Sequence, residues 1–294
     1  MLTGRHLLFV GGDARQLEVI SQVSDYDATA TLVGLDDADF PFADGVSHSE
    51  LNPEVFAQAD ALVLPVAGTD DKGSVSSQFC SEPIVLREAH FAAMRPGSFV
   101  FSGIARPYLE EQCQSHGLNL IKLMELDEVA ILNSIPTAEG ALCMAMKETD
   151  ITIHSALCTV LGFGRVGQTL ARTLHALGAK VQVVSNSPAQ LARIKEMGLR
   201  PIPIEELEHE VDTEDVIFNT IPTLVLTASV LRVMKQSVVI IDIASKPGGT
   251  DFRYAERRKL KALLVPSLPG QVAPKTAGKI IAKTLSRILS VSDF

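Results

Sequence analysis

The sequence predicts an α/β protein with two doubly wound parallel sheets, joined by crossing helices and separated by a cleft. Short apolar runs alternate with amphipathic segments of helical length along all 294 residues, and this alternation is typical of parallel βαβ units. A glycine-rich turn between an apolar run and an amphipathic segment occurs at residues 162–167, past the midpoint of the chain. Because the length suggests about two domains, we expect the first domain to lack such a turn and the second to carry it.

The composition favours a globular protein and argues against several classes of partner. Hydrophobic residues make up 46% and charged residues 21% of the chain. The net charge of −9 and the absence of a basic block argue against binding to a nucleic acid backbone. No apolar run approaches the roughly 18–20 residues that span a bilayer, and the first residues lack the features of a signal peptide. We therefore expect a cytoplasmic protein that does not bind a membrane. No metal site is predicted, because the four cysteines form no C-x-x-C pair.

The first domain is predicted over residues 1–135. It has five apolar runs that read as strands, and helical segments follow the first and the fourth of them. Pro107 stands where a proline is favoured, in the first turn of the helix after the fourth strand. The segment 69–83 is the longest loop, and it is expected to be either a lid or a surface excursion. The five runs lie within residues 5–10, 28–35, 59–68, 98–105 and 119–126.

Two helices are expected to cross between the domains. A connecting helix is predicted over residues 136–155, opened by Pro136 and Thr137, with apolar residues at helical spacing. A second helix over residues 274–294 is expected to pack back on the first domain. The first domain has no G-x-G-x-x-G, so it is predicted to be the substrate and catalytic domain.

The second domain, residues 156–273, carries the glycine motif in its proper context. An apolar strand at 156–161 precedes the turn, and a helix ending near Gly178 follows it. In a Rossmann-type turn the first glycine allows the tight bend, the second lets the backbone approach a pyrophosphate, and the third permits close packing of helix and strand. The amides at the start of the helix then face the phosphates. The residues predicted to bind the cofactor here are Gly162, Gly164, Arg165, Val166 and Gly167.

The end of the next strand informs the choice of cofactor. NAD enzymes usually place Asp or Glu there to hold the ribose hydroxyls, but this chain has Ser185, Asn186 and Ser187. Small hydroxyl and amide groups can bind a 2′-phosphate and do not repel its charge, so these three residues are predicted to bind the cofactor. NADP is favoured over NAD, with NAD left open. Arg193 and Lys195 lie downstream and belong either to the phosphate site or to a solvated helix face.

Later strands of the second domain also end in polar or glycine-rich loops. In a doubly wound sheet such loops gather at the carboxyl edge, where the ligand crevice forms. Asn219, Thr220 and Pro222 are predicted to line the nicotinamide ribose, and Asp242, at the end of the following strand, is also predicted to bind the cofactor. The alternative is that Pro and Gly only mark turns.

The motifs together resemble one family, the A subunit of dipicolinate synthase, over essentially the whole chain. They are "GGDARQ", "NSIPTAEGAL", "LGFGRVG", "NTIP", "IDIASKPGGTDF" and "PSLPGQVAPKTAG". The resemblance implies an oxidoreductase that forms pyridine-2,6-dicarboxylate from 4-hydroxy-tetrahydrodipicolinate, or from the dihydrodipicolinate derived from it. It also implies action in the cytoplasm of the mother cell of a sporulating bacterium, and a flavoprotein-like partner, the B subunit of dipicolinate synthase. A homo-oligomer is expected.

A dicarboxylate substrate calls for cations in the loops that follow the strands. Arg15 and Arg106 in the first domain are predicted to bind substrate, together with Thr137 at the start of the connecting helix. The alternatives are a solvated helix start for Arg15, turn packing for Arg106 and a helix cap for Thr137.

The candidate catalytic groups are Asp13, Glu139, Asp242 and Lys246. For Asp13, the role of N-cap of the first helix is favoured over a catalytic one. An acid such as Glu139 is favoured in a first helical turn in any case, and Asp242 is placed to pin the loop after its strand. Two other functions stay open: a dehydrogenase for another small carboxylic acid, and a non-catalytic NADP sensor or scaffold.

Overall fold

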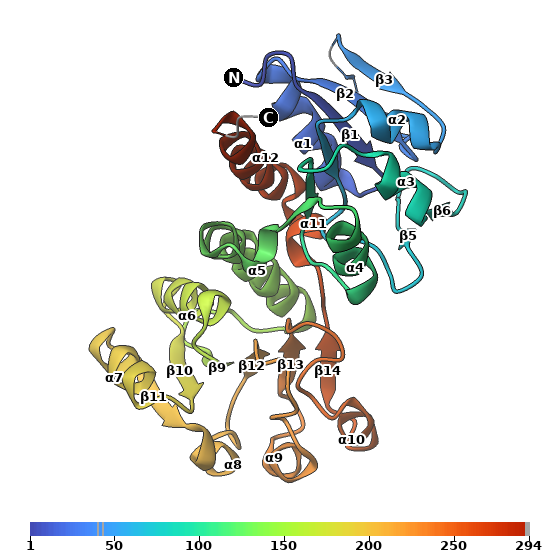
Figure 1. Cartoon of the computed structure of the whole chain (residues 1–294). Coiled ribbons are helices and arrows are strands. Elements are labelled where there is room, and N and C mark those ends of the chain that lie inside the picture. Colours follow the sequence, from blue (N-terminus) through green and yellow to red (C-terminus); the bar gives the residue numbers. More distant parts are fainter. Residues whose placement is uncertain (40, 43, 292–294) are drawn as a thin grey trace. The chain divides into compact units, whose positions relative to one another are not determined.

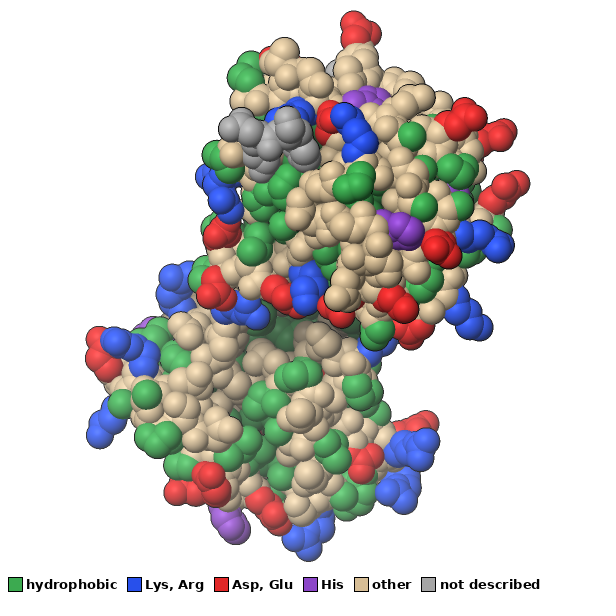
Figure 2. All heavy atoms as spheres, in the orientation of Figure 1, with side chains coloured by type: hydrophobic (Ala, Val, Ile, Leu, Met, Phe, Trp, Pro, Cys, Tyr) green, Lys and Arg blue, Asp and Glu red, His purple; other side chains and the backbone are tan. Residues whose placement is uncertain are grey.

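The computed structural model describes residues 1–39, 41–42 and 44–291. The chain divides into two compact units, which are described separately below (Figure 1). Unit 1 comprises Met1–Leu132 and Pro274–Phe294, and unit 2 comprises Asn133–Ala273. On the face shown in Figure 2, acidic and basic side chains are interspersed.

Unit 1 is built on a six-stranded sheet in the order β3-β2-β1-β4-β7-β8. All neighbouring strands are parallel. Helices cover both faces, and a separate apolar cluster fills each side of the sheet. The strands are β1 (His6–Val10), β2 (Thr29–Val33), β3 (Val46–His48), β4 (Ala61–Val63), β7 (Phe99–Ser102) and β8 (Asn119–Lys122), and the helices are α1 (Ala14–Asp25), α2 (Pro53–Gln58), α3 (Glu88–Ala93), α4 (Pro107–Ser115) and α12 (Pro274–Ser290), with a 3-10 turn at Leu123–Glu125.

The C-terminal helix α12 packs closely against α1. A Cβ atom built on Gly278 of α12 would lie 2.6 Å from Cβ of Glu18 and 2.7 Å from the carbonyl oxygen of Arg15. The two backbones approach this closely because residue 278 has no side chain. The apolar face of α12, including Ile281 and Leu285, completes the core of unit 1.

Two elements of unit 1 differ from the sequence prediction. Strand β3 was not predicted, because its three residues are mostly exposed and carry no apolar run. The predicted loop 69–83 contains β5 (Ser74–Val75), which pairs antiparallel with β6 (Ile84–Val85). The segment is therefore partly ordered by its own hairpin.

Unit 2 repeats the same strand order, β11-β10-β9-β12-β13-β14, with parallel neighbours. Its apolar strands are buried between helices on both faces, as expected for a parallel sheet. Two clusters form its core. The strands are β9 (Leu157–Leu161), β10 (Lys180–Ser185), β11 (Arg200–Pro203), β12 (Val216–Asn219), β13 (Val239–Asp242) and β14 (Lys261–Leu264), and the helices are α6 (Arg165–Ala176), α7 (Pro188–Glu196), α8 (Leu207–Glu210), α9 (Ala228–Val233), α10 (Phe252–Arg257) and α11 (Leu268–Val272), with a 3-10 turn at Ile204–Glu206.

Helix α5 (Asp127–Glu148) corrects the predicted connecting helix over 136–155. It begins nine residues earlier, and Pro136 lies inside it rather than opening it. Proline is usually found in the first turn because it lacks an N–H, and this preference led the prediction to the wrong boundary. The helix runs across the division between the two units at residue 132.

Among the described residues, one helix, α5, is long and apolar enough to cross a membrane by length and composition alone. The sequence analysis predicted no such segment. One such helix is weak evidence, because core helices of soluble proteins pass the same test. Ala138, Ala141 and Ala145 of α5 are buried in the core of unit 2, whereas Ile135 and Met146 are exposed.

Candidate dinucleotide site

The glycine turn of unit 2 joins β9 to α6 with the geometry that its sequence predicts. The Gly162 amide donates a hydrogen bond to the Val184 carbonyl oxygen (3.0 Å), and Gly162 has a φ of 94°, which L side chains rarely adopt. A Cβ atom on Gly167 would overlap the carbonyl oxygen of Gly162. The third glycine is therefore needed because the helix lies directly against the turn.

Gly164 is different, because nothing in the structure requires it to be a glycine. It is the N-cap of α6 at φ −79°, with no side-chain cap. No atom lies within 4 Å of the position that its Cβ would occupy. The turn thus leaves open backbone beside the first amides of a twelve-residue helix, which suits a pyrophosphate. Arg165 is exposed and Val166 is half-buried beside it.

The three polar residues of the turn after β10 have two different roles. Ser185 is buried; its hydroxyl donates to Oε1 of Gln190 (2.6 Å) and accepts from the Ser187 amide (3.0 Å). Ser187 caps α7, and its hydroxyl accepts from the Gln190 amide (3.5 Å). Asn186, between them, is exposed. Both serines therefore build the turn, and Asn186 is the side chain that the turn presents.

The loop after β12 is held by its own polar side chains. Asn219 is fully buried; its Nδ2 donates to the Ile221 carbonyl oxygen (2.9 Å), and its Oδ1 accepts from the Ile221 amide (3.0 Å). The Thr220 hydroxyl donates to the Leu161 carbonyl oxygen (2.7 Å), and Pro222 is exposed. Contact of these residues with a nicotinamide ribose stays a prediction, and their visible role is to shape the carboxyl edge.

Asp242 pins the loop after β13, which was the structural role expected of this residue beside its predicted roles in catalysis and cofactor binding. Its carboxylate accepts from the Ala244 amide (3.2 Å), the Gly249 amide (2.9 Å) and the Thr250 hydroxyl (2.7 Å). The side chain is fully buried, so its oxygens serve the loop. Lys246 is exposed in the same loop, and among the described residues no ion pair involves it.

In unit 1, the half-buried Asp13 and the buried Arg15 form an ion pair at the start of α1. Asp13 caps the helix by accepting from the Arg15 amide (3.0 Å), and its carboxylate also accepts from Nη2 of Arg15 at 2.6 Å. Burial raises the pKa of Asp13, but the hydrogen bonds and the charge of Arg15 outweigh it and lower the pKa below its ordinary value. The N-cap role is thus observed, and the expected alternative of a solvated Arg15 is wrong, since its side chain is only 9% exposed.

The carboxyl edge of the unit 1 sheet is covered by the chain itself. The Gly12 amide donates to the Ser76 carbonyl oxygen (3.0 Å), and the Gln78 amide donates to the Gly12 carbonyl oxygen (2.8 Å). The Ser77 hydroxyl donates to the Gly34 carbonyl oxygen at 2.6 Å, at the end of β2. Segment 69–85 therefore covers the strand ends of unit 1. In unit 2 the corresponding strand end carries the glycine turn, which is left open. This is the loop for which the sequence left a lid or a surface excursion open.

Three further predicted residues have clear positions but no visible ligand role. Arg106 is exposed at the N-cap of α4, directly before Pro107. The Thr137 hydroxyl donates to the Asn133 carbonyl oxygen (2.8 Å) within α5, so the expected helix cap is wrong. Glu139 is exposed in the middle of α5 rather than in its first turn.

One buried polar network was missed from the sequence. Glu214 is only 1% exposed; it accepts from the Thr159 hydroxyl (2.8 Å) and from Nε2 of Gln182 (2.5 Å). Burial raises the pKa of Glu214 above its ordinary value. The signal was the presence of Thr159 and Gln182 within otherwise apolar strands. The network lies near the amino ends of β9, β10 and β12, away from the glycine turn.

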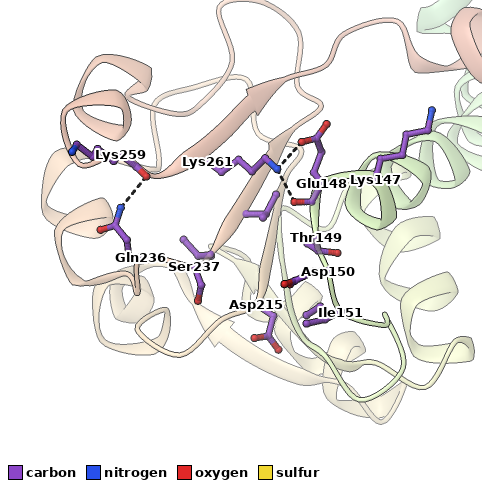
Figure 3. A pocket seen from close by; sticks show the side chains of 12 residues that line it. Lys147, Glu148, Thr149, Asp150, Ile151, Asp215, Gln236, Ser237, Lys259 and Lys261 are labelled. Carbon is purple, nitrogen blue, oxygen red and sulfur yellow. Dashed lines mark hydrogen bonds and ion pairs between the residues drawn. The ribbon is translucent and has the colours of Figure 1, made fainter.

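A polar hollow of about 460 Å³ lies at the same amino edge of unit 2 (Figure 3). Nζ of Lys261 donates to the Glu148 carbonyl oxygen, and Nε2 of Gln236 donates to the Lys259 carbonyl oxygen (both 2.8 Å). Because ligands of doubly wound sheets bind at the carboxyl edge, this hollow is not the dinucleotide site. Within the described residues no group of three or more His, Cys, Asp or Glu side chains is arranged to hold a metal ion.

The comparison with known sequences identifies the family. Residues 6–124 match the model for the N-terminal domain of the dipicolinate synthase A subunit. The chain is 47% identical to the dipicolinate synthase A subunit of Bacillus subtilis (strain 168) over 290 residues, which cover 99% of this chain and 97% of that protein. The chain belongs to the family of dipicolinate synthase A subunits.

Solved structures agree with this assignment. The crystal structure of the dipicolinate synthase A subunit from Bacillus halodurans is 49% identical with a TM-score of 0.95, over 99% of this chain and 100% of that chain. The A chain of dipicolinate synthase from Bacillus subtilis is 46% identical with a TM-score of 0.92, over 99% and 97%. Residues 133–290 match the alanine dehydrogenase/PNT C-terminal domain, which makes unit 2 an NAD(P)-type oxidoreductase domain.

Proposed function

We propose that this chain is an NADP-dependent oxidoreductase that forms pyridine-2,6-dicarboxylate during sporulation. One observation carries the proposal: in this member of the family, the backbone at Gly164 is open beside the first amides of α6. The substrate is 4-hydroxy-tetrahydrodipicolinate, or the dihydrodipicolinate that forms from it when water is lost. The relatives are named as one subunit of a synthase, which supports a partner, the B subunit. We further propose that the chain acts in the mother-cell cytoplasm.

The reaction removes two electrons and two protons from the dihydropyridine ring. Dihydrodipicolinate loses a hydride and a proton, and it becomes the aromatic pyridine dicarboxylate. When bound, the oxidised nicotinamide accepts that hydride. Because the product is aromatic, the step is favourable, and the protein contributes mainly by orienting a flat dicarboxylate and by receiving one proton.

The chain supplies the cofactor site through backbone atoms and the substrate site through exposed side chains. The turn at 162–167 and the first amides of α6 hold the pyrophosphate, and Asp242 holds the loop after β13 in place. Lys246 presents an exposed cation from that loop, so we assign it to a substrate carboxylate. We retain Glu139 as the proton acceptor among the acids, because the carboxylates of Asp13 and Asp242 are already engaged.

The cations of unit 1 differ in what they can offer a substrate. Arg106 is exposed, so its guanidinium is accessible to a carboxylate without rearrangement. Arg15 is held by Asp13 through both Nε and Nη2. We therefore assign Arg106 the larger contribution to substrate binding.

The expected homo-oligomer stays a prediction.

Two other functions compete with this proposal. A dehydrogenase for another small carboxylic acid would need the same cofactor site. A non-catalytic NADP sensor would bind the dinucleotide without any response to dicarboxylates. Coupling between the two ligands distinguishes the enzyme from the sensor. In the enzyme the dicarboxylate changes the NADP affinity, and NADP changes the dicarboxylate affinity by the same factor, whereas in the sensor neither affinity changes.

The test measures NADP binding to the full chain with and without saturating pyridine-2,6-dicarboxylate. We expect the dicarboxylate to change the NADP affinity at least about fivefold, and Lys246→Met to reduce this coupling. Lys283→Met, which alters an exposed lysine of α12, is the matched control and should retain the coupling. Tight NADP binding with no coupling in the unmodified chain would favour the sensor and contradict the proposal.

A further inference from the structure

A short stretch of the segment that covers unit 1 lies along the carboxyl edge of the sheet like one more strand. Ser77 forms a parallel bridge with Gly12, which follows the end of β1. The Gly12 amide donates to the Ser76 carbonyl oxygen, and the Gln78 amide donates to the Gly12 carbonyl oxygen. A Cβ atom on Gly11 would lie 2.8 Å from the Ser76 carbonyl oxygen. These contacts fix the stretch at the edge where ligands of doubly wound sheets bind.

The side chains of this stretch alternate between its two sides. Val75 is buried, and the half-buried Ser77 donates from its hydroxyl to the Gly34 carbonyl oxygen (2.6 Å). Ser76 and Gln78 are exposed, as expected because successive residues of an extended strand point to opposite sides. Among the described residues, none forms a hydrogen bond with the side chain of Ser76 or Gln78. Both side chains therefore have their donors available for a ligand.

The chemistry of these two side chains suits a carboxylate. The Gln78 amide has two N–H donors and the Ser76 hydroxyl has one O–H donor, and hydrogen bonds to a charged acceptor are the stronger ones. Their Cα atoms are about 6.6 Å apart in an extended strand, so both side chains can reach one small group. The acid that lies next along the chain from Gly12 is Asp13, and its charge is neutralised by Arg15, so it does not repel an anion here.

We propose that Gln78 and Ser76 bind one carboxylate of the dicarboxylate substrate, with Gln78 donating from Nε2 and Ser76 from its hydroxyl. The inference rests on the proposed function and adds two binding residues to the substrate site of unit 1. It also gives segment 69–85 a role other than that of a lid or a surface excursion. The segment fixes hydrogen-bond donors at the carboxyl edge of the sheet, where the glycine turn of unit 2 offers backbone amides instead.

The experiment measures the affinity of the full chain for pyridine-2,6-dicarboxylate by calorimetric titration, in the presence of saturating NADP and without turnover. Gln78→Glu replaces the amide by a carboxylate of nearly the same shape, so it exchanges two donors for a negative charge. We expect this variant to bind the dicarboxylate at least about tenfold more weakly, the effect of one hydrogen bond to a charged group. Gln78→Ala and Ser76→Ala should each weaken binding several-fold, and the NADP affinity should stay unchanged in all three variants.

Gln58→Glu is the matched control, because it makes the same substitution at another exposed glutamine of unit 1. Gln58 is the last residue of α2, and β4 begins at Ala61, so this side chain lies at the amino edge of the sheet. The control adds the same charge to the same unit and should retain the affinity for the dicarboxylate. Both variants should melt at the temperature of the unmodified chain, because surface substitutions away from special contacts change stability little.

The outcomes separate this inference from the proposed function. If Gln78→Glu binds the dicarboxylate as tightly as the unmodified chain, the inference is overturned and the proposed reaction stands with its substrate bound elsewhere. If Gln58→Glu weakens binding as much as Gln78→Glu, the effect is one of net charge, and the inference is again overturned. An unmodified chain that binds NADP tightly but binds no dicarboxylate would contradict both the inference and the proposed function.

Discussion

The Gly164→Ala substitution should remove dinucleotide binding while leaving the fold intact. Its new methyl group meets no protein atom within 4 Å, and the φ of −79° is allowed for alanine. Alanine is a poorer N-cap than glycine, at a cost of about 0.5–1 kcal/mol. Loss of glycine flexibility in the unfolded chain returns about 0.4–1 kcal/mol. The two effects nearly cancel, so the unliganded variant should unfold within about 1 kcal/mol of the unmodified chain.

The effect on binding should be much larger. The Cβ atom occupies the open space beside the first amides of α6, where a pyrophosphate must approach within hydrogen-bond distance. Hydrogen bonds to charged groups contribute about 1.5–3 kcal/mol each. Loss of one or two of them is about 3 kcal/mol, which corresponds to more than about a hundredfold in affinity.

Thermal unfolding with and without NADP provides the assay. At a ligand concentration of about 100 times Kd the unmodified chain should gain about 2.7 kcal/mol from the nucleotide, and Gly164→Ala should gain almost nothing. Calorimetric titration checks the affinity directly. If Gly164→Ala bound NADP like the unmodified chain, the pyrophosphate would not lie at this turn, and the reasoning would be refuted.

Three further substitutions test the remaining geometry. Gly167→Ala should destabilise the unliganded chain by about 3 kcal/mol or more, because its Cβ overlaps the Gly162 carbonyl oxygen; an unchanged melting temperature would contradict this packing. Asp13→Ala should cost about 1–2 kcal/mol at neutral pH, since it removes a helix cap and leaves Arg15 buried without a partner. Because the folded-state pKa of Asp13 is lowered, this difference should vanish as the pH falls through that pKa. The folded-state pKa of Glu214 is raised, so its contribution to stability is greatest below pH 4.5 and falls as the pH rises through the folded-state pKa. Glu214→Gln should flatten this pH dependence in unfolding curves measured over a range of pH. An unchanged dependence of stability on pH would contradict the expectation.

The glycine turn could be predicted because its signal is local. Strand, three glycines and helix follow each other along one short stretch of chain, and Gly162 and Gly167 are required by the close contacts that their missing side chains permit. The parallel sheets could be predicted for the same reason, since buried strands are short apolar runs.

What could not be predicted depends on contacts between distant parts of the chain. Segment 69–85 covers the ends of β1 and β2 through bonds to Gly12 and Gly34, and no local pattern encodes that contact. The roles of Asn219 and Asp242 as loop pins depend on which backbone groups reach them in the folded state. The start of α5 was misplaced because proline is favoured in the first turn of a helix, and the sequence does not show that Pro136 instead lies inside one.

The most direct test of the central claim is an absorbance assay at the nicotinamide band. The purified chain, alone and with the B subunit, receives NADP and freshly generated 4-hydroxy-tetrahydrodipicolinate, and the pyridine dicarboxylate is measured in parallel. We predict that NADPH and pyridine-2,6-dicarboxylate form in equal amounts with the unmodified chain, and that Gly164→Ala forms neither. Pyridine dicarboxylate produced without NADP reduction, or no turnover with and without the B subunit despite tight NADP binding, would contradict the account.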